Sequence, residues 1–318
     1  MKKIHYTLVL LAMSSITHYS YGSKIVGLVP GRNESIMLAQ HLRALSLFVD
    51  AIVYLDDASE DNSVQIVESI AAECKVEKII KKEVWYRDEP GDRNKLLMEG
   101  RAIGGTHFIV LDVDEMITSN SLRNNYLRNQ ILALNPGDQL YLLWIQLWRD
   151  VSHFRIDECP FTWNYTGFIF CDDGECFYKS DFLHTSRIPN NLKGKVVTIK
   201  KYPKDYTHGV IHFQFVNKRN LLIKQAWYRC LELIRDPSKS ISKINEIYGE
   251  SKKEDNLLLR NIPKQWFSGY PFFDSTIYQK PELWRETQIL NWFDEYGKTF
   301  FEQLDIWDID WGTGLEKQ

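Results

Sequence analysis

Short apolar runs alternate with amphipathic stretches up to about residue 150 of the chain. Four apolar runs rich in β-branched residues predict buried strands over residues 24–30, 51–55, 77–82 and 107–111. The stretches between them carry apolar residues three and four positions apart, the spacing of an amphipathic helix, and they are residues 34–47, 61–74 and 92–103. This alternation predicts βαβ units around a mostly parallel sheet.

Short oxygen-bearing side chains stand where these helices are expected to begin. Ser59 or Asp61 is placed to cap the second helix and Asp92 the third, because a side-chain oxygen can accept from free amides of the first turn. A further helix is expected from about residue 120 to 134. The turn of residues 135–138 then leads into an apolar strand, residues 140–148.

The pattern changes in the second half of the chain. Between about residues 149 and 204, strand-like pieces such as GFIFC and KVVTIK are separated by polar turns, which predicts an antiparallel extension. Later segments predict helices over residues 218–234, 241–250 and 282–304. The expected fold class is therefore α/β, with a mixed, mostly parallel sheet flanked by helices, an antiparallel extension and a helical C-terminal tail. The expected parts are a sheet domain, residues 23–216, and a helical extension, residues 217–318.

Length and charge limit the kinds of function. With 318 residues, 44% of them hydrophobic, the chain can bury a sizeable core as one large domain or as a domain with an extension. The formal net charge is −3, and the charged residues of both signs are interspersed. A nucleic-acid backbone needs a basic face, so we expect no nucleic-acid partner.

The N-terminal segment, residues 1–22, has the pattern of a signal peptide. Lys2 and Lys3 precede an apolar stretch, and Ser20 and Gly22 are spaced as at a cleavage site. The stretch is too short to span a bilayer comfortably, and no other segment is long enough, so no further membrane-spanning segment is expected. We expect export or residence in a secretory lumen; if the segment is not a signal peptide, the protein would be cytoplasmic.

Five cysteines are consistent with either an oxidising or a reducing compartment. Cys171 and Cys176 are close enough in the sequence to form a disulfide. Cys74 and Cys230 lie in helix-like stretches, where buried thiols are common.

Two of the predicted strands end in acidic residues. Asp56 and Asp57 follow one of them, and Asp112 and Asp114 follow another in the stretch FIVLDVDE. Because the carboxyl ends of parallel strands meet at the same edge of a sheet, four carboxylates are expected to lie close together there. Repulsion between four neighbouring carboxylates is costly unless a bound ligand offsets their charge. An Asp-x-Asp pair offers hard oxygen donors to a divalent cation.

Three stretches, in this order, resemble family 2 glycosyltransferases with the GT-A fold: VGLVPGRNES, IVYLDDASEDNS and RNKLLMEGRAIGGTHFIVLDVDE. The resemblance covers residues 24–118 well and the rest of the chain only in scattered pieces. It implies a nucleotide-sugar half, about residues 24–118, and an acceptor half, about residues 119–216. The implied reaction is sugar transfer from a nucleotide-diphosphate sugar to a glycan, protein or lipid-linked acceptor, most simply with inversion.

The resemblance also implies roles for individual residues. The implied contacts to the donor are made by Pro30, Arg32, Asn33, Glu34, Asp56, Asp57, Ser59, Arg93 and Asp112. The implied ligands of Mn²⁺ or Mg²⁺ are Asp112 and Asp114, with His212 completing the site. Several have an ordinary structural alternative: a plain strand–helix turn for residues 30–34, a strand end that meets a solvated turn for Asp112 and Asp114, solvated helix charge for Arg93, and a core histidine for His212.

An inverting reaction needs a base for the acceptor hydroxyl. The turn CDDGEC offers Asp172, Asp173 and Glu175, which are the expected catalytic residues. Asp157 and Glu158 are alternatives, and a solvated acidic turn would explain all five. Two other functions remain open on the same residues: an inactive secreted protein that binds glycan, and a nucleotidyltransferase on a similar sheet.

Overall fold

The computed structural model of the protein describes residues 22–311, apart from residues 158, 160, 161, 163, 180–183, 200–207, 250 and 251. Nearly all of the predicted signal peptide, residues 1–22, therefore lies outside the described residues. Within the described ranges, no helix has the length and apolar character needed to cross a membrane.

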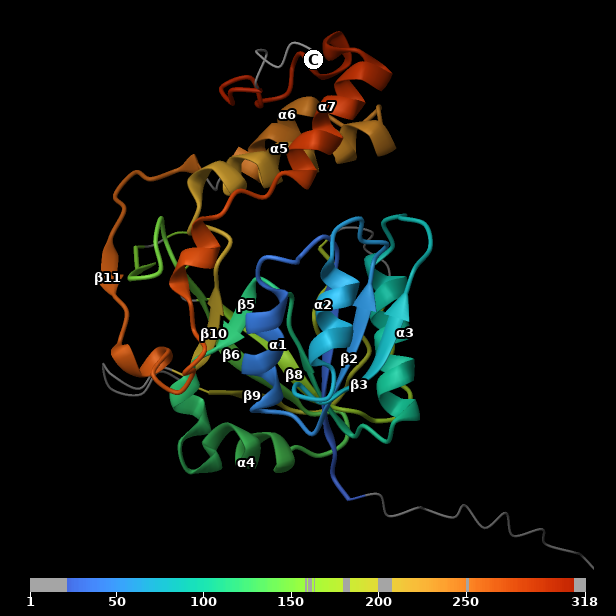
Figure 1. Ribbon diagram of the computed structural model, residues 1–318, viewed down its shortest axis with the longest axis vertical. Coiled ribbons are helices and arrows are strands. Elements are labelled where there is room, and N and C mark those ends of the chain that lie inside the picture. The colour runs from blue at the N-terminus through green and yellow to red at the C-terminus, as the bar shows by residue number, and fades with distance from the viewer. Residues whose placement is uncertain are drawn as a thin grey trace, which may run out of the picture.

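A nine-stranded mixed sheet forms the body of the described residues (Figure 1). Eight strands follow the order β3-β2-β1-β4-β8-β6-β10-β5, and β9 pairs with β6 outside this order. The four strands at one end are parallel: β1 (Ile25–Gly31), β2 (Ala51–Asp56), β3 (Val76–Lys81) and β4 (His107–Val110). The other strands are β5 (Glu115–Ile117), β6 (Gln139–Gln146), β8 (Tyr165–Cys171), β9 (Val196–Thr198) and β10 (Gly209–His212). β8 runs antiparallel to both β4 and β6, while β9 and β10 run parallel to β6.

Helices cover both faces of this sheet. α1 (Leu38–Ser46), α2 (Ser63–Ile70) and α4 (Tyr126–Leu132) pack their apolar residues into one core cluster, and α3 (Glu89–Ala102) packs into another with β1 and β2. Successive residues of β1 alternate between the two clusters, because neighbouring side chains of a strand point to opposite faces. The strand is therefore apolar throughout.

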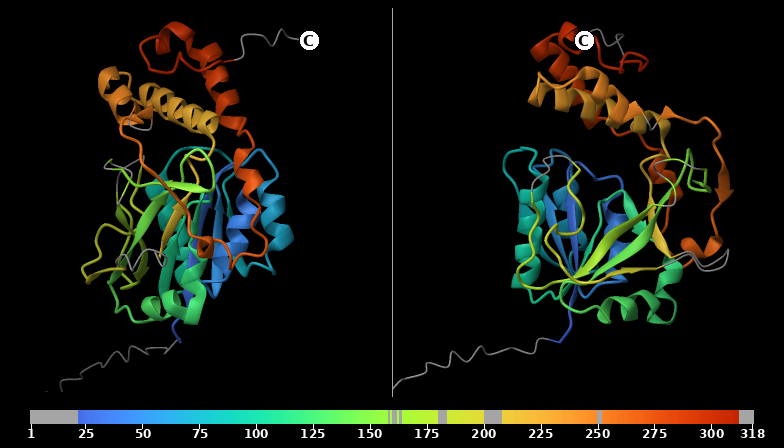
Figure 2. Two further views of the ribbon diagram at one scale, coloured as in Figure 1. Left: turned by 90° about the vertical axis from the view of Figure 1, so that its left-hand side faces the viewer. Right: turned by 180° about the vertical axis from the view of Figure 1, so that it is seen from behind.

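The chain after residue 217 builds a core of its own. α5 (Lys218–Arg235), α6 (Ile241–Gly249) and α7 (Trp284–Tyr296), here called the helical cap, enclose a cluster that includes Trp227, Cys230 and Phe293. The cap lies across the edge of the sheet where the parallel strands end (Figure 2). The predicted fold class is confirmed.

Between α6 and α7 the chain returns to the sheet. β11 (Leu259–Asn261) pairs with β7 (His153–Arg155), and Tyr270 and Tyr278 enter the core beneath α1. Short 3-10 helices cover Ser119–Asn125, Lys264–Trp266, Ser275–Gln279 and Lys298–Phe301.

Several helix ends differ from the predictions, each for a local reason. α1 begins at Leu38 because the side chains of Ser59, Asp61 and Ser63, in the β2–α2 loop and at the start of α2, accept from the amides of residues 33–35. α3 is capped by Asp88, whose side chain accepts from the amide of Gly91 at 3.0 Å, and Asp92 lies inside the helix. α7 ends at Tyr296, since Gly297 adopts a φ of 80°.

Cys171 and Cys176 are free thiols, which corrects the suggested disulfide.

Candidate active site

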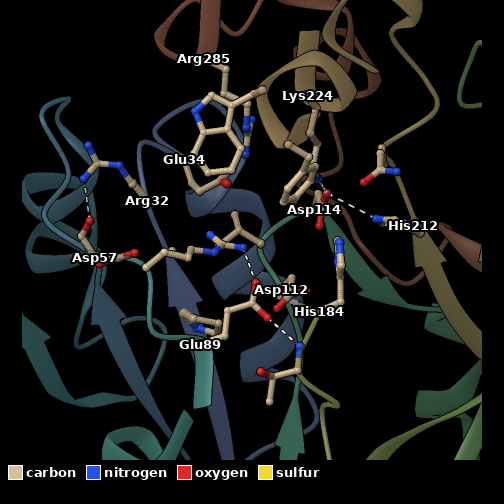
Figure 3. Close-up of a pocket in the computed structure, with 18 of the residues that line it drawn as sticks. Arg32, Glu34, Asp57, Glu89, Asp112, Asp114, His184, His212, Lys224 and Arg285 are labelled. Carbon is tan, nitrogen blue, oxygen red and sulfur yellow. Dashed lines mark hydrogen bonds and ion pairs between the residues drawn. The ribbon is translucent and has the colours of Figure 1, made fainter. Parts of the chain in front are cut away.

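A cavity of about 500 Å³ opens between the carboxyl edge of the sheet and the helical cap (Figure 3). Its lining comes from the β1–α1 loop, the start of α3, the end of β4, residues 184–187, α5 and α7. The crevice beyond the carboxyl ends of parallel strands is where ligands bind in open α/β sheets. The cavity therefore lies where the sequence places the acidic residues.

Two loops at one end of the cavity are bonded together. The amide of Asn33 donates to the hydroxyl of Ser59 at 2.9 Å, and the Asn33 side-chain oxygen accepts from the amide of Glu60 at 2.7 Å. Arg32 donates to the carbonyl oxygen of Asp57 at 2.7 Å. Pro30, Arg32, Glu34 and Asp57 line the cavity. Asn33 and Ser59 instead hold the two loops in register.

The two aspartates at the end of β2 differ in their surroundings. Asp56 is buried beneath the loop, where its side chain accepts from the amide of Ser59 at 2.9 Å. Asp57 reaches the cavity and lies 2.5 Å from the ammonium of Lys82, which is also 2.9 Å from Asp92. Only one residue of the predicted pair therefore lines the described cavity.

Asp112, at the end of β4, is held by two arginines. Its carboxylate lies 2.7 Å from Arg187 and 3.3 Å from Arg93, and Arg187 also binds the buried Glu115 at 2.5 Å. Burial by itself would raise the pKa of Asp112, but Arg187 and Arg93 outweigh it and lower the pKa below its usual value. Asp112 is therefore an anion in a largely positive setting.

Asp114 contacts a different set of groups. One oxygen of its carboxylate lies 2.9 Å from the ammonium of Lys224 on α5 and 3.4 Å from Nε2 of His212 on β10. Burial opposes ionisation here too, but the ammonium of Lys224 brings the pKa of Asp114 well below its usual range. The ring of His212 stacks on Trp144, with centroids 4.8 Å apart, so its position is fixed.

The donor set at Asp114 fits a divalent cation. Nδ1 of His212 lies 2.7 Å from the side-chain oxygen of Gln146, so Nδ1 carries the proton and the lone pair of Nε2 faces the carboxylate of Asp114. A carboxylate oxygen and an imidazole nitrogen facing one space suit Mn²⁺, and the oxygen suits Mg²⁺. Asp112 is turned to its arginines instead, so the structure brings together two of the three predicted ligands.

A group of three metal-ligand side chains within the described ranges lies elsewhere, at Asp172, Asp173 and Cys176. Asp172 follows β8, which is antiparallel to β4, so Cys171 pairs with His107 at the amino end of β4. Asp172 forms two bonds to Arg101, of 2.8 and 2.7 Å.

The expected catalytic residues Asp172, Asp173 and Glu175 are therefore not brought to the cavity described here, whose lining includes none of them. The direction of β8 is the physical reason, because it delivers this turn to the opposite edge of the sheet. Of the alternatives, Asp157 is bonded to Arg155 at 2.8 Å, and Glu158 lies outside the described residues.

Among the predicted contacts to the donor, Arg93 has two guanidinium nitrogens without a hydrogen-bond partner in the described part of the chain. Its side chain is buried at the cavity wall, and its Nε and Nη1 have no partner among the described residues. A buried guanidinium that lacks partners is costly unless an anion completes it. The site thus presents hydrogen-bond donors to an anionic ligand.

The lining residues with no role in the sequence-based prediction include Glu89, His184, Arg187 and Lys224. Lys224 sits in a helix where a charge is usually solvated, and the residues around His184 have no recognisable period. Their places depend on contacts between distant parts of the chain, so no local signal identifies them.

No protein-family model matches the chain, and no curated protein matches its sequence. Among solved structures it is similar to S. aureus TarS 1-349 in complex with UDP, with 14% identity over 89% of this chain and 81% of that chain and a TM-score of 0.41.

It is also similar to a mannosyltransferase from Pyrobaculum calidifontis in complex with GDP-Man and Mn²⁺, with 20% identity, 39% of this chain and 36% of that chain covered, and a TM-score of 0.31. A third is glucosyl-3-phosphoglycerate synthase from Mycobacterium tuberculosis in complex with Mn²⁺, UDP and glucosyl-3-phosphoglycerate, with 21% identity, coverages of 40% and 45%, and a TM-score of 0.27. The likeness to these proteins is one of fold alone.

Proposed function

We propose that the protein is a glycosyltransferase that moves a sugar from a nucleoside-diphosphate sugar to an acceptor hydroxyl with inversion. The observation that carries this proposal is the juxtaposition, in one cavity, of the Asp112–Asp114 strand end with three cationic side chains. These are Arg93, Arg187 and Lys224. A site of this kind suits a ligand that combines a diphosphate with polar hydroxyls.

The cationic groups have different roles in binding the donor. Arg93 offers its guanidinium to the diphosphate from the cavity wall, and Lys224 supplies a positive charge beside Asp114. Asp114 and His212 would hold Mn²⁺ or Mg²⁺, which when bound neutralises charge on the departing diphosphate. At the other end, Asp57 is an acceptor-only group for the nucleoside.

A donor screen tests the proposal. The purified protein is incubated with Mn²⁺ and a panel of UDP-, GDP- and dTDP-sugars, and release of free nucleoside diphosphate is measured. We expect turnover of at least one donor. Replacing Asp114 by alanine should lower that rate by about 10²–10³-fold, the usual cost of removing a group that stabilises charge in the transition state.

The matched control is Asp294→Ala, an exposed aspartate on α7 outside the cavity lining, which should keep the wild-type rate. A folded protein that turns over no donor and binds no nucleotide with Mn²⁺ would refute the proposal. That outcome would favour the inactive glycan-binding alternative.

A further inference from the structure

We propose that His184 is the base that takes the proton from the acceptor hydroxyl, and that Tyr248 and Glu232 are positioning residues that hold its ring in the active tautomer. The inference rests on the proposed glycosyl transfer and supplies its missing base. It starts from the finding that the acidic turn 172–175 lies at the opposite edge of the sheet.

His184 is held in the cavity wall by contacts on both its backbone and its ring. Its φ is 63°, a left-handed conformation that a non-glycine residue keeps only where its surroundings enforce it. The next amide, that of Thr185, donates to Glu89 at 2.7 Å. Two residues further, Arg187 binds Asp112 and Glu115. The loop is therefore fixed against α3 and the end of β4 (Figure 3).

A chain of hydrogen bonds assigns the tautomer of His184. Lys239 forms an ion pair with one oxygen of Glu232, and the hydroxyl of Tyr248 donates to the other. A tyrosine hydroxyl has a single proton to give, so its oxygen accepts from Nε2–H of His184 at 3.1 Å. Nδ1 is then left with a lone pair. This is the form that a general base requires.

The arrangement follows the logic of an acid-oriented histidine, in which a partner fixes one ring nitrogen so that the other can accept a proton. Burial lowers the pKa of His184, and Arg87, Lys224 and Lys239 lower it further against the opposing effect of Glu89. The ring is consequently neutral near pH 7. The rings of Tyr228 and Tyr248 pack against it, with centroids 5.1 and 6.0 Å away.

The carboxylates of the described lining are less suited to this role. Lys82 holds Asp57 and Asp92, the two arginines hold Asp112, and Lys224 holds Asp114. Glu89 is engaged by Arg87 and by the amide of Thr185. Glu34 projects from the β1–α1 loop beside Arg285 (Figure 3). Burial and the nearby Glu282 raise the pKa of Glu34 well above its usual value, which favours the protonated form, and a protonated carboxyl cannot accept the proton.

The proposed step is balanced. The acceptor oxygen forms a bond to the anomeric carbon while the bond from that carbon to the diphosphate oxygen breaks. The electron pair of the broken bond leaves with the diphosphate, and the hydroxyl proton goes to Nδ1 of His184. The resulting imidazolium keeps its Nε2–H bond to Tyr248, whose hydroxyl remains bonded to Glu232.

Water and azide serve as probes, since both can replace the acceptor. With a donor that the wild-type protein hydrolyses, His184→Ala should lower hydrolysis by about 10²–10⁴-fold, the usual contribution of a general base. The affinity for the nucleoside diphosphate should stay unchanged. Azide carries no proton, so it needs no base, and it should restore the release of nucleoside diphosphate with formation of the glycosyl azide.

Two further variants make the test specific. Tyr248→Phe removes the acceptor for Nε2–H and should lower kcat with little change in KM, while His153→Ala, at a half-buried histidine of β7 outside the described lining, should change neither. Wild-type hydrolysis by His184→Ala would overturn the assignment and leave the proposed function intact. A loss that azide fails to restore would also overturn it, and a wild-type protein inactive on every donor would overturn both.

Discussion

The two aspartates at the end of β4 differ in the groups that contact their carboxylates. Asp112 and Asp114 are two positions apart in the chain, yet one faces two arginines and the other faces Lys224 and His212. The same residue type therefore has two roles within one strand end. Asp112 is shielded by guanidinium groups, whereas Asp114 shares a space with an imidazole nitrogen.

Arg93 provides a test at this scale. Arg93→Met should weaken the binding of a nucleoside diphosphate by about 10–100-fold, because hydrogen bonds to a charged group are worth about 1.5–3 kcal/mol each. Isothermal titration calorimetry with UDP and GDP measures the change. Arg43→Met, at an arginine paired with Glu73 on the surface, is the control and should bind normally. Equal affinity of the two variants would contradict the role given to Arg93.

His41 makes the stability depend on pH. Burial lowers its pKa to about 4, partly opposed by its bond to the carbonyl oxygen of Glu115, whereas an unfolded histidine has a pKa of about 6.5. Between these values the unfolded chain binds more protons, so the free energy of unfolding falls as the pH is lowered. From pH 7 to pH 5 this residue should account for a loss of about 2 kcal/mol.

Urea unfolding at the two pH values checks this prediction. His41→Gln keeps a side-chain donor for the carbonyl group but cannot titrate, so its stability should fall less between pH 7 and pH 5. The same pH slope in the variant and the wild-type protein would show that His41 is not the group responsible.

At the scale of elements, α5 joins the two halves of the site. Lys224, Trp227 and Tyr228 are three and four positions apart, so they share one face of the helix, and all three line the cavity. Trp227 also enters the core of the helical cap. A disturbance of α5 is therefore expected to affect both stability and the site.

The start of α5 offers the corresponding test. The side chain of Asn217 accepts from the amide of Asn220 at 3.1 Å and caps the helix. Asn217→Ala should lower the free energy of unfolding by about 1 kcal/mol. Asn217→Asp should lower it less, because aspartate keeps the cap bond and loses only the bond that the Asn217 amide donates to the carbonyl oxygen of Gln279 at 2.9 Å. Chemical denaturation measures the free energy of unfolding of both variants. A loss of the same size in both variants would mean that the cap bond is not what stabilises this end.

For the whole molecule, the decisive feature is that the cavity lies between the sheet and a helical cap that has a core of its own. The sheet supplies the acidic edge, and the helical cap supplies Lys224, Tyr228 and Trp284. A ligand in this cavity contacts both parts, so binding is expected to stabilise the assembled protein more than either part alone.

Thermal unfolding with and without ligand tests this expectation. UDP or GDP with Mn²⁺, at about one hundred times its Kd, should raise the free energy of unfolding by about 2.7 kcal/mol and the midpoint with it. Hydrogen exchange should slow in α5 as well as at the end of β4. Asp114→Ala should show a smaller effect under the same conditions. Protection confined to the sheet would contradict the placement of the ligand beneath the cap.

The sequence by itself determined the parallel part of the sheet and the edge at which acidic residues collect. Those features follow from local patterns: apolar strands, helical spacing and aspartates directly after β2 and β4. Tertiary structure decided the rest, because it depends on pairings between distant segments. The direction of β8 sends Asp172 to the far edge, and the packing of α5 brings Lys224 to Asp114, although neither contact leaves a periodic signal in the chain.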